Sequence, residues 1–127
     1  MTRAYLAFTE KGLALAQKLA SALPGTVARC GHGGPGLADW TAEQFAHADA
    51  LIFVGAVGIA VRAIAPHCRS KAVDPAVVVL DECGHFAVPI LSGHLGGAND
   101  LARALAAVCG AVPVITTATD ANGVFAV

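Results

Sequence analysis

A histidine inside a glycine-rich bend is the first feature of this sequence that could do chemistry. His94 lies in LSGHLGGAND, residues 91–100, just ahead of an expected helix. A histidine exchanges a proton near neutral pH, so His94 suits general acid–base catalysis. The alternative is a turn histidine bonded to nearby backbone. The neighbours that could bring backbone or a hydroxyl close to a ligand are Ser92, Gly93, Gly96 and Gly97. A serine nucleophile is disfavoured, because neither G-x-S-x-G nor S-x-x-K surrounds Ser92.

Hydroxyl and carboxyl side chains gather in TTATD, residues 116–120, directly after an apolar run. Thr116, Thr117 and Asp120 can present several oxygen atoms to a ligand there. Asp120 could act as a base, orient a histidine or form a turn.

Two glycines follow the apolar run LIFV and open an expected helix. The N-terminus of a helix that begins near Gly55 and Gly58 would offer free N–H groups to a carboxylate or phosphate. The same glycines could instead allow tight packing only. Arg62, further along this helix, could clamp an anionic ligand or be an exposed helix residue. A nucleotide site is disfavoured, since G-x-G-x-x-G and the P-loop lysine are both missing.

Alternating apolar patterns predict the elements that position these residues. Strands are expected at 4–8, 51–54, 76–80 and 112–116, and 27–30 could form a further strand. The runs at 51–54 and 76–80 are expected to be buried. Residues 86–90, which contain Pro89, could return as an antiparallel or edge strand. Helices are expected over 10–23 with Thr9 as N-cap, from a capping box at 41–44, from 55–58 to about 65, and over 99–109. We therefore predict an α/β fold: a three-layer α/β/α sandwich with a mostly parallel sheet, in a single domain.

Ligands of such sheets bind beyond the carboxyl ends of the strands. We therefore expect four loops, at 9–10, 55–58, 92–97 and 116–120, to gather at one edge and line one cleft. Asp74 precedes a strand, so it is expected at the opposite end, in a turn.

The composition excludes several classes of protein. The 127 residues are 56% hydrophobic and 13% charged, with a net charge of −1 and no basic run, which argues against nucleic-acid binding. No run of about 20 apolar residues and no signal-peptide pattern is present, so we expect no membrane partner and a cytoplasmic location.

Neither the cysteines nor the remaining histidines form a pattern of metal ligands. The four cysteines (Cys30, Cys68, Cys83 and Cys109) form no CxxC pair, so we expect small buried hydrophobes and no metal site. The other histidines (His32, His47, His67 and His85) have no matched neighbours, and we expect them to be structural or solvent-exposed.

Three ordered segments resemble the N-terminal domain of the CbiG family, the cobalt-precorrin-5A hydrolases of anaerobic cobalamin biosynthesis. They are FVGAVGIAVRAIAP (53–66), DPAVVVLDECGHFAVPILSGHLGGAN (74–99) and PVITTATD (113–120). The resemblance implies that residues 1–127 form a CbiG N-terminal-like domain without the family's C-terminal domain. It also implies a further domain or partner chain, because the family continues beyond such a domain.

The resemblance implies a hydrolase that opens the ring A acetate lactone of cobalt-precorrin-5A, releases acetaldehyde and leaves cobalt-precorrin-5B. No cofactor is implied, since the cobalt is carried by the corrinoid substrate. From residue chemistry we assign catalysis to His94, as general base or acid, and to Asp120, which would orient His94 or a water. The residues assigned to substrate binding are Gly55, Gly58, Arg62, Ser92, Gly93, Gly96, Gly97, Thr116 and Thr117. The alternative is a non-catalytic tetrapyrrole- or anion-binding module that acts with a partner.

Overall fold

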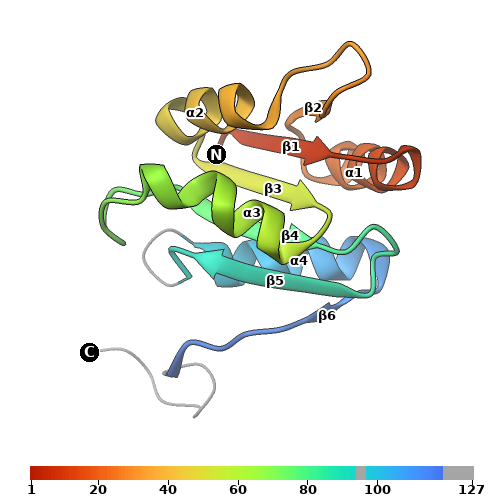
Figure 1. The fold of residues 1–127 in the computed structure, drawn as a ribbon. Coiled ribbons are helices and arrows are strands. Elements are labelled where there is room, and N and C mark those ends of the chain that lie inside the picture. Colours follow the sequence, from red (N-terminus) through yellow and green to blue (C-terminus); the bar gives the residue numbers. More distant parts are fainter. Residues whose placement is uncertain (94–96, 119–127) are drawn as a thin grey trace.

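Helices and strands alternate through most of the chain (Figure 1). The computed structural model describes residues 1–93 and 97–118. The strands are β1 (Arg3–Ala7), β2 (Thr26–Arg29), β3 (Ala50–Val54), β4 (Ala76–Leu80), β5 (Phe86–Leu91) and β6 (Val112–Pro113). The helices are α1 (Glu10–Ala22), α2 (Leu37–His47), α3 (Val57–Ile64) and α4 (Ala98–Cys109), and the short 3₁₀ helix η1 (Ala65–His67) follows α3.

The strands form one sheet in the order β2-β1-β3-β4-β5-β6. The first four strands are parallel to one another, β5 is antiparallel to β4, and β6 is parallel to β5. The mostly parallel sheet is therefore confirmed, and so is the antiparallel option for β5. The edge option is wrong, because β6 pairs with the outer side of β5. Pro89 is tolerated because its partner Val78 adjoins an irregularity of the ladder.

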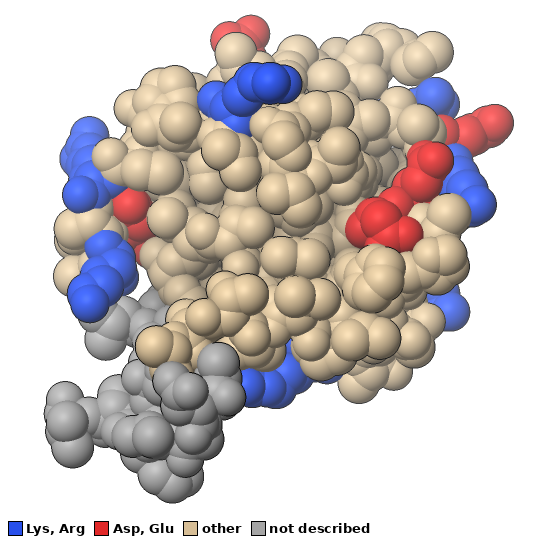
Figure 2. Space-filling view, turned by 60° about the horizontal axis from the view of Figure 1, so that its bottom comes forward, with Lys and Arg blue, Asp and Glu red and all other residues tan. Residues whose placement is uncertain are grey.

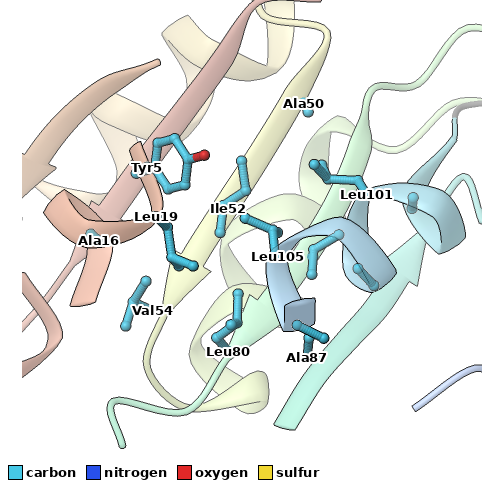
Figure 3. Packing of buried hydrophobic residues seen from close by; sticks show 14 of the residues in the cluster. Tyr5, Ala16, Leu19, Ala50, Ile52, Val54, Leu80, Ala87, Leu101 and Leu105 are labelled. Carbon is cyan, nitrogen blue, oxygen red and sulfur yellow. The ribbon is translucent and has the colours of Figure 1, made fainter. Parts of the chain in front are cut away.

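Helices cover both faces of the sheet, which confirms the three-layer α/β/α sandwich. On one face α1 and α4 pack onto the sheet, and Leu19, Ile52 and Leu105 point into their shared core (Figure 3). On the other face Trp40 of α2 and Ile64 of α3 pack over β1, β3 and β4. All residues of β3 and β4 are buried, as their unbroken apolar runs predict.

Two local predictions are wrong, and one is confirmed. The capping box at Thr41 does not start a helix, because α2 begins at Leu37 and buries Trp40 and Thr41. Trp40 contacts Phe53 edge-on, with 5.4 Å between ring centroids, so packing extends this helix backwards. The last strand stops at Pro113, and only Val114 N–H continues its pairing, by donating to Ala87 O at 2.9 Å. Thr9 is the N-cap of α1, since its hydroxyl accepts from Gly12 N–H at 3.0 Å.

Several of the cysteines and histidines are exposed. Cys68 and Cys83 are exposed, so the prediction of buried cysteines is wrong for these two, which lie in loops after η1 and β4. His32, His47 and His85 are exposed, and His67 packs against Phe45 with ring centroids 5.7 Å apart. None of the helices in the described part of the chain is long and apolar enough to cross a bilayer.

Tyr5 makes the stability of the core beneath α1 and α4 depend on pH. Its ring is fully buried and its hydroxyl donates a hydrogen bond to Leu23 O at the end of α1. Burial raises the pKa of Tyr5 above its ordinary value. A raised pKa means that the neutral phenol contributes stability below the unfolded-state pKa of about 10, and that this stability is lost as the pH rises further.

We expect the free energy of unfolding, measured with urea, to fall above pH of about 10, the ordinary tyrosine pKa. Tyr5→Phe should remove this share of the decline and cost about 1 kcal/mol at neutral pH through the lost hydrogen bond. Because Tyr5 is the one tyrosine in the sequence, phenolate absorbance reports its titration directly. Titration of the folded protein at the ordinary tyrosine pKa would contradict this account.

Candidate functional site

The antiparallel direction of β5 divides the predicted site residues between two edges of the sheet. Gly55 follows β3 at the carboxyl edge of the parallel strands, near the loop that follows β1. Ser92 follows β5, and Thr116 follows β6, at the opposite edge (Figure 1). The prediction that all four loops line one cleft is therefore wrong, because it treated every strand as parallel.

At the carboxyl edge the two glycines have different roles. A Cβ atom on Gly55 would come within 2.8 Å of Phe8 Cδ2, so Gly55 is needed for close packing. Gly58 is exposed in the first turn of α3, and a Cβ there would meet nothing within 4 Å. Of the two, Gly58 is the glycine whose backbone a ligand could approach.

Further polar contacts at the carboxyl edge join the loops after β1 and β4. The Thr9 hydroxyl donates to Glu82 Oε2 at 2.5 Å. Lys11 Nζ donates to Cys83 Sγ at 3.2 Å, and this hydrogen bond raises the pKa of Lys11. These groups bond to one another across the edge, and sequence reasoning missed Glu82 because its segment reads only as a turn.

At the opposite edge, hydrogen bonds close the loop that carries His94 onto the start of α4. Ala98 N–H donates to Ser92 O at 3.1 Å, and Asn99 N–H donates to Gly93 O at 3.0 Å. The first two N–H groups of α4 are thus used within the protein. Gly97, the N-cap, has a φ of 82°, a backbone conformation that favours glycine.

Ser92 is held in an uncommon conformation beside Asp74. Its φ is 57°, in the left-handed region that a non-glycine residue rarely adopts. Its side chain is buried, and its hydroxyl donates to Asp74 O at 3.1 Å. The Ser92 hydroxyl therefore positions the loop, and such strain is typical of functional sites. Asp74, which sequence reasoning set aside at the opposite end, is a neighbour of this loop because β5 runs antiparallel.

Asn99 connects the loop to the segment after β6. Its amide Nδ2 donates to Thr117 Oγ1 at 3.0 Å, and its side chain is buried. A Cβ on Gly93 would lie 2.8 Å from Asn99 Oδ1 and 3.1 Å from Thr117 Cγ2. Gly93, Asn99 and Thr117 thus form one packed unit, and Thr116 beside it is exposed. The sequence signal for Asn99 was its place in the first turn of the helix expected directly after the His94 bend.

A hollow adjoins this unit through Asp74. It encloses about 360 Å³, and its walls include Phe45, His67, Arg69 and Asp74. Both carboxylate oxygens of Asp74 accept from the backbone N–H of Arg69, at 3.1 and 2.9 Å, so the Arg69 guanidinium is not used in this contact. Arg62 is exposed in the last turn of α3, which returns toward this edge, where β4 begins. Arginines that reach this edge could pair with carboxylates of a ligand.

Three predicted site residues, His94, Gly96 and Asp120, lie outside the described residues, so their roles stay predictions. Within residues 1–93 and 97–118, no group of three or more His, Cys, Asp or Glu side chains could hold a metal ion.

The fold and this edge define an α/β domain whose candidate ligand site is built from the β5–α4 loop, the start of β4 and the segment after β6. Residues 39–120 match the family model described as "Cobalamin synthesis G N-terminal". The chain belongs to this family.

The relatives are longer than this chain. It is 48% identical to a cobalt-precorrin-5A hydrolase of Salmonella typhimurium over 94% of its own length, but spans 36% of that protein. A cobalt-precorrin-5A hydrolase of Priestia megaterium is 53% identical over 55% of this chain, which spans 19% of it. The crystal structure of a cobalamin biosynthesis protein G homolog from Sulfolobus solfataricus matches 91% of this chain, and 36% of its own, with a TM-score of 0.76 and 28% identity.

Gly93 and Gly58 give a matched pair of predictions, because a side chain has no room at Gly93 and open space at Gly58. We expect Gly93→Ala to lower the free energy of unfolding by about 1–3 kcal/mol, because the new methyl group overlaps Asn99 and Thr117. Gly58→Ala should raise it by about 0.5–1 kcal/mol, because alanine favours a helix and has open space there. Urea unfolding of both variants measures this, and equal effects would contradict the packed unit.

Proposed function

We propose that this chain is the N-terminal part of a cobalt-precorrin-5A hydrolase of cobalamin biosynthesis. The reaction would open the ring A acetate lactone by hydrolysis, release acetaldehyde and give cobalt-precorrin-5B. The observation that carries the proposal is the 48% identity to the Salmonella typhimurium protein of that name, over 94% of this chain. We place the reaction in the cytoplasm.

Lactone hydrolysis needs a base for the attacking water and a donor for the oxyanion. We assign the first role to His94, oriented by Asp120, and the second to N–H groups at Gly96 and Gly97. The hydrogen bonds of Ser92 and Gly93 with Ala98 and Asn99 support this assignment, since they anchor both ends of the segment that carries His94. A reacting group must meet its substrate in one geometry, and fixed flanking residues favour this.

Binding of the substrate would depend on its acetate and propionate groups. Arg62 and Arg69 can each offer a guanidinium to a carboxylate, with paired N–H groups in a fixed geometry. Thr116 is exposed at the same edge and can donate a hydrogen bond. The cobalt would arrive with the corrinoid, and we propose no resident cofactor. Gly55 and Gly58, at the far edge, are the weakest members of the assigned binding set, and Gly55 is needed for close packing.

The relatives' additional length supports a substrate site that this domain shares with the rest of the family protein. This chain spans about a third of the Salmonella typhimurium relative. A large macrocycle needs more contact surface than one edge of a small domain offers. We therefore propose that a further domain or a partner chain completes the substrate site.

A chimaera tests the proposed reaction. In the Salmonella typhimurium relative, the matching segment is replaced by residues 1–127 of this chain. We expect the chimaera to release acetaldehyde from cobalt-precorrin-5A, and His94→Ala to slow this by about a hundredfold or more, the usual loss of an acid–base group. His85→Ala is the matched control, because His85 is exposed in the turn before β5.

Undiminished release by the His94→Ala chimaera would contradict the role of this histidine. Corrinoid binding by the unsubstituted chimaera without acetaldehyde would instead favour a non-catalytic tetrapyrrole-binding module.

A further inference from the structure

Within residues 1–93 and 97–118, the helices leave part of one sheet face uncovered. On the face that carries α2 and α3, the core is formed over β1, β3 and β4, whereas α4 packs on β5 from the other side. Ala87 points toward α4, so its neighbour Phe86 points to the open side. Phe86 and its cross-strand partner Val112 are 50% and 56% exposed. Large apolar side chains so exposed leave this side of β5 and β6 suited to contact with a partner.

Helix α3 extends the uncovered apolar surface. Val57 and Val61 lie one turn apart on α3 and are 40% and 46% exposed. Ile90 of β5 packs against the same core as Ile64 of α3, so the helix and the strand are neighbours. We call this surface the β5–α3 face and define it by Val57, Val61, Phe86 and Val112.

The β5–α3 face is poor in charge. Residues 86–93 and 112–118 contain no Lys, Arg, Asp or Glu, and Arg62 is the one charged residue of α3. Figure 2 shows a wide central expanse of the molecule without these residues, with the charged groups at its margins. Exposed apolar side chains in a region poor in charge favour contact with another protein surface. It does not suit a polyanion, which would need basic groups.

We infer that the β5–α3 face is the docking surface for the remaining part of the family protein, whether joined to this domain or carried by a separate chain. This rests on the proposed function. The chain spans only 36% of the Salmonella typhimurium relative and 36% of the matched Sulfolobus solfataricus chain. Nearly two thirds of each relative lies outside the part that this chain matches, and the uncharged open side of β5 and β6 is suited to contact with it.

The β5–α3 face begins at the carboxyl edge of the parallel strands. Phe86 and Val112 are the first residues of β5 and β6, and Val57 is the first residue of α3. Ser92 follows the other end of β5. A partner that also completes the substrate site would therefore have to extend along β5 from Phe86 to Ser92.

Hydrogen exchange of β5 and β6 tests the docking surface. We compare the isolated 127-residue chain with the chimaera described above, and we expect backbone amides of β5 to exchange about tenfold more slowly, or slower still, in the chimaera. The double variant Val61→Asp and Phe86→Asp should abolish this protection in the chimaera. In the isolated chain it should leave the fold intact, because both side chains are half exposed.

Val73→Asp is the matched control, because Val73 is 71% exposed but precedes β4, outside the β5–α3 face. It should leave the protection unchanged.

Three results would overturn the inference. One is equal exchange of β5 in the chimaera and the isolated chain. Another is protection in the isolated chain that rises with its own concentration, which would assign the face to a second copy. The third is protection of the isolated chain by cobalt-precorrin-5A alone, which would assign the face to substrate. Acetaldehyde release is read separately, so a protected face without release refutes the proposed function and leaves the docking surface standing.

Discussion

The reversal of chain direction between β4 and β5 is the constraint on which the candidate site depends. Because β5 is antiparallel, it delivers Ser92 to the edge where β4 begins. There the Ser92 hydroxyl bonds to Asp74 O, and Asn99 of α4 reaches Thr117 after β6. If β5 were parallel to β4, these groups would lie beside Gly55 and Gly58 instead. The site thus belongs to the end of the sheet opposite the usual ligand-binding edge of parallel strands.

Several contacts at this edge hold the residues on either side of residues 94–96. Two backbone hydrogen bonds close the loop onto α4, Ser92 is held with a φ of 57°, and Gly93 has no room for a methyl group. Each hydrogen bond contributes about 1 kcal/mol. Fixed residues on both sides of residues 94–96 support the proposed role of His94, because precise placement of a reacting group is worth far more than the bonds that provide it.

Most of the fold could be predicted from the sequence, because apolar runs and helical periods reflect burial directly. The runs at β3 and β4 and the N-cap at Thr9 were recognised in this way. The start of α2 was missed, since the packing of Trp40 on Phe53 is not local. The site was only partly predictable. The residue types at 92–97 and 116–117 were recognised from the sequence. Their separation from Gly55 was not, because it follows from the direction of β5, which the sequence pattern did not decide. Asp74 and Asn99 were missed because their importance lies in contacts with residues 18 positions away.

The central claim is that substrate meets the protein at the Ser92 edge, and the cobalt of the substrate offers a direct test. A paramagnetic cobalt(II) corrinoid bearing the lactone broadens the NMR signals of nearby amides. In the chimaera described above, we expect broadening at Ser92, Gly93, Asn99 and Thr117, with Gly58 and the loop after β1 unaffected. Broadening centred on Thr9, Gly55 and Gly58, with the Ser92 edge unchanged, would contradict this claim.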